Sequence, residues 1–158
     1  MTGVASPART WLAVRIALIL IVVAGLAVDA YTHLHLASDY DPVKTSTLSQ
    51  GDLFRAESVV AILVALLLIV HPRRWTAAIA ALVAGSALAA VLVYRYVNIG
   101  QIGPIPSMYE ASWYTEKTIS AIAEGAAFLA AIGLLLIPWG PRTAAGAHRR
   151  SGTVPPES

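Results

Sequence analysis

The chain has 158 residues, of which 57% are apolar and only 13% are charged, and its formal net charge is +2. Soluble domains carry about twice that charged fraction, so the composition is that of an integral membrane protein. The sequence contains no cysteine, which excludes disulfide chemistry and cysteine-ligated metal sites. It also has no basic stripe with interleaved aromatic residues, so we expect no nucleic-acid partner.

Four segments are apolar over about 20 residues, the length that a helix needs to cross a bilayer. They cover residues 16–35, 51–70, 76–95 and 118–137. All four are expected to be helices, because four strands cannot close a barrel. The link at residues 71–75 is so short that the second and third spans must form a helical hairpin. The sequence therefore predicts an all-α membrane protein, an antiparallel four-helix transmembrane bundle over residues 1–139 with the lipid bilayer around it.

The residues outside the spans predict the orientation of the chain. Residues 140–158 combine proline, glycine, serine and charge, so we expect a disordered tail. Seven of the eleven basic residues lie on the same side as this tail, at Arg9, Arg15, Arg73, Arg74, Arg142, Arg149 and Arg150. Nearly all acidic residues lie on the opposite side. Because positive residues stay in the cytoplasm, both termini are predicted to be cytoplasmic, with the protein in the plasma (cell) membrane.

The first span has a second interpretation. Arg9 and Arg15, the apolar run after them and residues 28–30 are also compatible with a cleavable signal peptide. Cleavage would leave three spans. However, the apolar character continues through Leu34 and Leu36, and an aspartate is unusual in a cleavage motif. We therefore expect the first span to be retained.

Three of the four predicted spans carry a carboxylate at one depth. Asp29, Glu57 and Glu124 each lie thirteen residues from the cytoplasmic end of their span. At 1.5 Å per residue this is about 20 Å, which leaves roughly 10 Å to the outer border. Small residues recur on the same helical faces, a pattern typical of closely packed membrane helices. The three acids are therefore expected to face inward and to form one polar layer.

Basic side chains lie near enough to neutralise this layer. Arg55 is half a turn above Glu57, and Arg95 ends the third span. His33 follows Asp29 at i+4, on the same helical face. The predicted polar layer comprises Asp29, His33, Arg55, Glu57, Arg95 and Glu124. It has two interpretations, an interhelical salt-bridge network that fixes the register of the helices or a site for a proton, a divalent metal or a polar ligand.

A metal site in this layer would have mixed nitrogen and oxygen ligands. Its ligands would come from Asp29, His33, Glu57 and Glu124. No Glu-x-x-His or His-x-x-x-His spacing supports it, so no cofactor is predicted and a divalent metal stays an alternative. Haem fits less well, because His71 lies at the cytoplasmic border and His148 in the tail. No glycine-rich phosphate loop and no G-x-S-x-G elbow occurs, so we expect no enzymatic activity.

The second long connection, residues 96–117, has two interpretations as well. Four of its side chains could cover the polar layer as a lid, or they could form an interfacial loop with an aromatic belt. These side chains are Met108, Tyr109, Glu110 and Trp113. The loop interpretation is the simpler of the two.

Residues 31–68 carry a family resemblance. An H-L-x-L stretch is followed by a tyrosine in a loop, a threonine, and Leu-Phe at the start of the second span. The residues that fill this pattern are His33, Leu34, Leu36, Tyr40, Thr47, Leu53 and Phe54. The stretch resembles small four-span membrane proteins of high-GC actinobacteria, a family without an assigned activity. The chain departs from the pattern at Arg55 and Glu57, and the resemblance implies only a fold and a membrane location.

These observations favour a non-enzymatic membrane protein that acts as an accessory or assembly partner of a larger membrane complex. The outer loops and the alanine-rich third span would then contact another membrane protein or a second copy of the chain. The alternative is a small transporter or sensor that binds a proton or cation at Asp29, Glu57 and Glu124. A membrane redox protein that uses quinone or haem is the third hypothesis.

Overall fold

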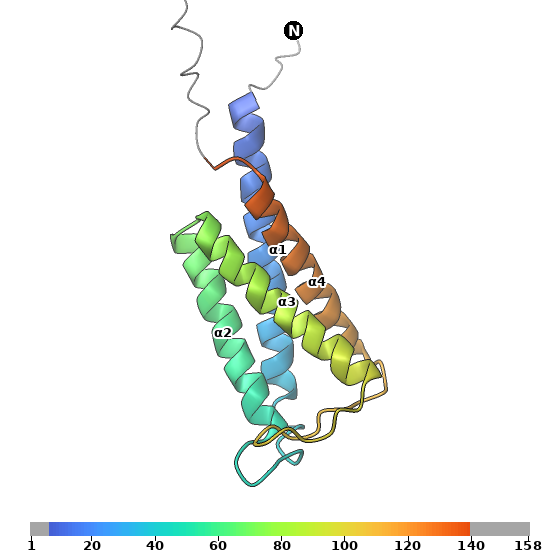
Figure 1. The fold of residues 1–158 in the computed structure, drawn as a ribbon. Helices are drawn as coiled ribbons and strands as arrows, with labels where there is room; N and C mark the ends of the chain where they lie inside the picture. Colours follow the sequence, from blue (N-terminus) through green and yellow to red (C-terminus); the bar gives the residue numbers. More distant parts are fainter. Residues whose placement is uncertain (1–6, 140–158) are drawn as a thin grey trace, which may run out of the picture.

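The computed structural model describes residues 7–139, and this part of the chain consists of four long α-helices joined by irregular connections (Figure 1). The helices are α1 (Pro7–Leu36), α2 (Gln50–Val70), α3 (Arg74–Tyr96) and α4 (Thr115–Leu136). All four are long and apolar enough to cross a membrane, which confirms the prediction of an all-helical chain with four candidate spans. The predicted tail, residues 140–158, lies outside the described residues.

Helix α1 differs most from its predicted span, because it begins at Pro7 and not at residue 16. The additional turns carry Arg9, Trp11 and Arg15. The predicted border excluded them because the two arginines interrupt the apolar run. These residues nevertheless continue the helix. Proline is favoured in the first turn, where its missing N–H would have no helical partner.

Helix α2 begins one residue before its predicted span because a capping box fixes its start. The Ser49 side chain accepts a hydrogen bond from the backbone N–H of Asp52 at 3.0 Å. The Asp52 carboxylate in turn accepts one from the backbone N–H of Ser49 at 3.0 Å. Each side chain thus satisfies a backbone donor that has no partner within the helix.

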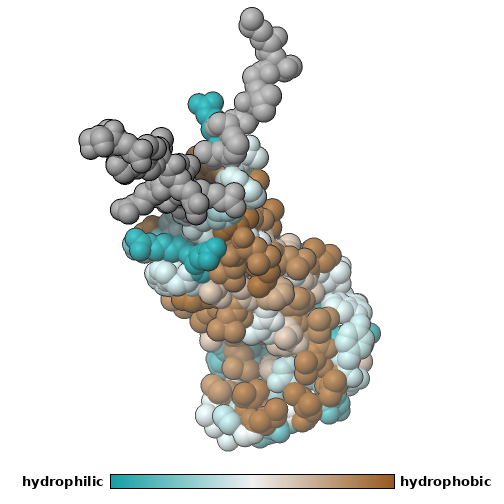
Figure 2. Space-filling model, turned by 45° about the horizontal axis from the view of Figure 1, so that its top comes forward, coloured by the Kyte–Doolittle hydropathy of each residue, from teal (hydrophilic) through white to brown (hydrophobic). Residues whose placement is uncertain are grey.

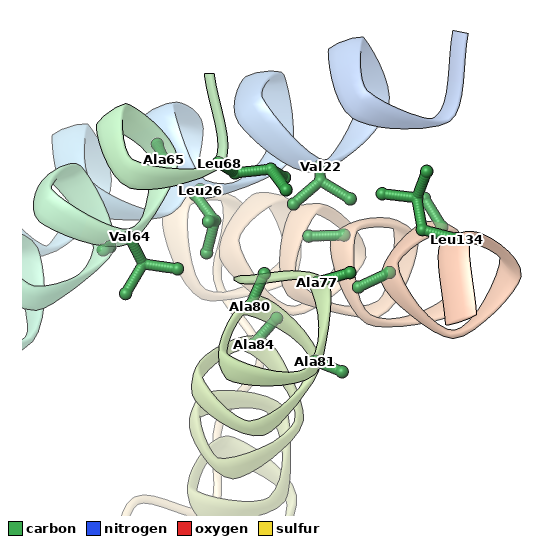
Figure 3. Close-up of a cluster of buried hydrophobic side chains, with 14 of the residues drawn as sticks. Val22, Leu26, Val64, Ala65, Leu68, Ala77, Ala80, Ala81, Ala84 and Leu134 are labelled. Carbon is green, nitrogen blue, oxygen red and sulfur yellow. The ribbon is translucent and has the colours of Figure 1, made fainter. Parts of the chain in front are cut away.

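The helices pack through small side chains. Helix α1 packs against α2 and α4, α4 also packs against α3, and the contact between α2 and α3 is the least extensive of these four. Alanines, leucines and valines fill the shared core (Figure 3). The members drawn and labelled there include Val22, Leu26, Val64, Leu68, Ala77, Ala80, Ala84 and Leu134. Small residues let membrane helices approach closely, and this core has that composition.

Helices α1 and α4 lie very close together at Gly25. A Cβ atom at this position would lie 2.6 Å from the carbonyl oxygen of Ala123 and 2.8 Å from the Cβ of Ala127. Neither atom belongs to a flexible side-chain end, so any larger residue would force the two helices apart. Gly25 therefore sets the distance between α1 and α4.

The surface of the helices is strongly apolar. Hydrophobic side chains dominate the helical part of the face in Figure 2. Each helix has leucines that point away from the core, with exposed fractions of 62% for Leu20, 60% for Leu63, 72% for Leu82 and 69% for Leu129. Water would disfavour such a surface, whereas hydrocarbon does not. The helices are therefore suited to contact with lipid.

The two long connections, residues 37–49 and 97–114, lie together at one end of the molecule (Figure 1). The hydroxyl of Thr45 donates a hydrogen bond of 2.9 Å to the carbonyl of Pro104, and that of Tyr40 donates one of 2.8 Å to Glu110. A tight turn at Ile102–Ile105 contains Gly103 with φ 55°, a conformation that favours glycine. We call these two connections the loop cap. The short link at residues 71–73 lies at the opposite end.

Candidate functional site

Four polar side chains meet between α1 and α4, near the loop cap. His33 Nδ1 lies 2.8 Å from Asp29 Oδ1. Ser120 Oγ lies 2.8 Å from the same Asp29 oxygen and 3.0 Å from Glu124 Oε1. Only 1% of Asp29 and 1% of Glu124 is exposed. We call Asp29, His33, Ser120 and Glu124 the polar cluster.

The geometry of the polar cluster follows from helical spacing. Asp29 and His33 are four residues apart on α1, and Ser120 and Glu124 are four apart on α4, so each pair shares one face. Gly25 lies one turn from Asp29 and brings the two faces into contact. The close helix contact thus links the four side chains in series, from His33 to Asp29, Ser120 and Glu124.

The hydrogen bonds of the polar cluster are incomplete. The Ser120 hydroxyl has one hydrogen, so it can donate to only one of the two carboxylates at a time. Asp29 Oδ2 and Glu124 Oε2 are buried without a hydrogen-bond partner among the described residues. A buried carboxylate that lacks a partner costs several kcal/mol. Because His33 supplies at most one positive charge, the cluster needs a further proton or cation to balance two carboxylates.

Three residues of the polar cluster lie close enough together to be considered as metal ligands. One ligand atom each from Asp29, His33 and Glu124 lies within 4.8 Å of the other two. The ligands of a tetrahedral zinc ion lie about 3.4 Å apart, so these side chains would have to move together by about 1 Å to bind a single ion.

Glu57 lies outside the polar cluster, on the wall of a cavity of about 480 Å³. The cavity lies between α2 and α3, with α1 and α4 behind it and part of the loop cap at its end. Its polar lining includes His33, Glu57, Glu110, Tyr114, Lys117 and Ser120. His33 and Ser120 belong to both the cavity and the polar cluster, so the cluster can be reached from the cavity.

Arg55 does not reach the predicted polar layer. Its guanidinium binds both oxygens of Asp41 in the loop cap, at 2.7 and 2.8 Å. Two residues along a helix turn a side chain by about 200°, so Arg55 and Glu57 point in different directions. The hydrogen bonds from Arg55 lower the pKa of Asp41 below its ordinary value. Arg55 thus fastens the loop cap to α2 and does not neutralise Glu57.

Arg95 also lies outside the polar cluster. Its guanidinium carbon is 4.9 Å from the ring centre of Tyr96 and 5.8 Å from that of Trp113. These cation–π contacts hold the Arg95 side chain at the border of the helices, away from the carboxylates of the core. Of the six residues predicted for the polar layer, the structure brings together Asp29, His33 and Glu124. Glu57 lies on the neighbouring cavity.

Several residues around the site had no clear signal in the sequence. Ser120 bridges the two carboxylates, and only its i, i+4 spacing from Glu124 pointed to it. Lys117 Nζ donates a hydrogen bond of 2.9 Å to the carbonyl of Glu110, and both residues line the cavity. Such a contact depends on the loop conformation, which periodicity does not predict.

The lid interpretation of the second connection is met in part. Met108 and Glu110 line the cavity, whereas Tyr109 and Trp113 are exposed. Tyr40 of the first connection bonds to Glu110 and lies 2.9 Å from the Tyr114 hydroxyl. Burial and these two bonds raise the pKa of Tyr40 above its ordinary value, so it stays a neutral donor. The loop cap therefore covers one end of the cavity.

No protein-family model matches the chain, and comparisons with curated proteins and with solved structures gave no significant match. The resemblance to actinobacterial four-span membrane proteins stays a prediction. The function is therefore inferred from the chemistry of the polar cluster and the cavity.

Proposed function

We propose that this chain is a small transporter or sensor that binds a cation at the polar cluster. In this proposal it forms an antiparallel four-helix bundle in the plasma membrane, with both termini in the cytoplasm. The excess of arginine at the end away from the loop cap supports this orientation. The polar cluster and the cavity would then lie in the outer half of the membrane.

The proposal rests on two buried carboxylate oxygens that have no hydrogen-bond partner among the described residues. Asp29 Oδ2 and Glu124 Oε2 lie in one cluster with a histidine, inside helices that suit a lipid surrounding. With both carboxylates ionised, these acceptors stay unsatisfied, and each unpartnered buried group lowers stability. A bound cation supplies the positive charge and the partners that these oxygens lack.

The ligand set favours a particular class of cation. One imidazole nitrogen, two carboxylates and a nearby hydroxyl form a mixed nitrogen and oxygen site. Imidazole suits zinc and other transition metals, and carboxylates suit manganese as well. Zn²⁺ and Mn²⁺ are therefore the ions to test, and a proton would occupy the cluster in their absence.

Zn²⁺ binding to the purified protein in detergent tests the proposal. Isothermal titration should show one ion per chain for the parent. Replacing Asp29 by Asn or Glu124 by Gln should weaken binding at least about 10-fold, because each change removes a charged ligand. Asp39→Asn is the matched control, since this exposed acid of the loop cap belongs to no cluster. No binding to the parent, or equal binding to all four proteins, would contradict the cation site.

The accessory role expected from the sequence stays a prediction. The two outer loops were one of its expected contact surfaces, and they bind each other in part. Thr45 binds Pro104 and Tyr40 binds Glu110 across the two connections. Helix α3, the other supposed surface, packs on α4 and lines the cavity. The geometry therefore favours the cation site over a docking role.

A further inference from the structure

The cavity between α2 and α3 has the size of an organic ligand site. Its volume of about 480 Å³ falls within the range of about 300–1,000 Å³ that is typical of such sites. The lining combines apolar side chains, which supply most of its surface, with polar groups from all four helices and the loop cap. Metal ions and protons need no such space, so the cavity requires an explanation beyond the polar cluster.

The cavity opens sideways, through the surface that α2 and α3 turn toward lipid. Its rim consists of four side chains that both line the cavity and are exposed. These are Ala56 and Val60 on α2 and Ser86 and Ala90 on α3. At the end toward the loop cap, Ile105 and Met108 form part of the wall. The two helices diverge from their short link toward this end (Figure 1). A ligand would therefore enter from the bilayer and not from water.

Glu57 gives the cavity a carboxyl group without a hydrogen-bond partner among the described residues. Its Oε1 atom is buried. The other charged groups of the lining are paired, since Lys117 lies 3.9 Å from the Glu110 carboxylate and His33 lies 2.8 Å from Asp29. Among the described residues, Glu57 is therefore the charged side chain of the lining that has no partner.

We propose that the cavity binds a lipophilic amine, an amphipathic molecule with a protonated amine and a hydrocarbon chain. The ammonium group would lie against Glu57 and complete its charge and hydrogen bonds. The hydrocarbon chain would lie between α2 and α3 and reach the bilayer through the rim. An alcohol cannot supply a counter-charge to Glu57, and a fatty acid would place a second carboxyl group beside it. The site is centred on Glu57, although His33 and Ser120 line it and also belong to the polar cluster.

Binding of tritiated dodecylamine to the full chain in nanodiscs of zwitterionic lipid tests this inference. The parent should bind the amine saturably, at one molecule per chain. Unlabelled dodecylamine should displace it at concentrations at least about 10-fold lower than dodecanol or dodecanoate, because only the amine balances the carboxylate. Equal displacement by the alcohol, or no saturable binding, would overturn the proposal.

Variants separate the two parts of the ligand. Glu57→Gln should weaken amine binding about 10-fold or more, whereas Glu57→Asp should restore most of it. Val60→Trp should block the rim, and its neighbour Val59, exposed but not part of the lining, gives the control Val59→Trp. Unchanged binding in Glu57→Gln or in Val60→Trp would contradict the assignment. If Glu57→Gln does not fold, the tryptophan pair decides alone.

Zn²⁺ titration of the same preparations distinguishes this inference from the proposed function. A parent that binds dodecylamine but takes up no Zn²⁺ contradicts the cation site alone. A parent that binds Zn²⁺ but no amine contradicts the amine site alone.

Discussion

Replacing His33 by leucine should lower the free energy of unfolding by about 3–5 kcal/mol, the usual effect of removing one partner of a buried charge pair. His33 Nδ1 lies 2.8 Å from a carboxylate oxygen of Asp29, which is 1% exposed. Without the imidazole, two carboxylates would face each other in an apolar surrounding. Unfolding in mixed detergent and SDS micelles would measure the change.

Two further variants make this result specific. His35→Leu is the control, because His35 is exposed and stacks only on Tyr31. It should change the unfolding free energy by less than about 0.5 kcal/mol. The double variant Asp29→Asn, His33→Leu should be more stable than His33→Leu, because it removes the carboxylate that was left alone. Equal losses for His33→Leu and His35→Leu would show that the polar cluster carries no buried charge pair.

Replacing Gly25 by alanine should lower the unfolding free energy by about 1–3 kcal/mol, the cost of overpacking a tight helix contact. The added Cβ would lie 2.6 Å from the Ala123 carbonyl and 2.8 Å from the Ala127 Cβ, so α1 and α4 must separate. Separation would also pull Asp29 and His33 away from Ser120 and Glu124. We therefore expect Zn²⁺ affinity to fall together with stability.

Gly125→Ala is the control, because it should leave the free energy of unfolding unchanged or raise it. A Cβ at Gly125 would meet only the Leu88 Cδ2 atom, at 3.9 Å, which is an ordinary contact. Alanine favours the helix over glycine by up to about 1 kcal/mol, so this variant should be as stable as the parent or more so. The same SDS titration compares the two variants. A stable Gly25→Ala protein would mean that α1 and α4 do not pack as closely as described.

The positions of the carboxylates along the spans predicted part of the site. Asp29 and Glu124 were placed at one depth, and the structure brings them into the same cluster. Glu57 was placed at the same depth but lies across a cavity from them. Depth describes only the position along a helix axis. Whether side chains meet also depends on the rotation and the spacing of the helices, and α2 and α3 diverge toward the loop cap (Figure 1).

The partners of the arginines could not be predicted by the same means. Arg55 was expected to pair with Glu57, yet it binds Asp41, fourteen residues earlier in the first connection. Arg95 lies over the ring of Trp113, which belongs to the second connection. Both contacts depend on how irregular segments fold over the helix ends. Hydrophobic periodicity carries no information about such segments.

In the proposed function, a metal ion replaces a proton at the polar cluster. Titration of Zn²⁺ in two buffers of different ionisation enthalpy measures this exchange directly. We predict the release of at least one proton for each bound ion, since a proton balances the two carboxylates when no metal is bound and the His33 imidazole must be neutral to bind a metal. Binding without proton release, or no binding at all, would contradict it.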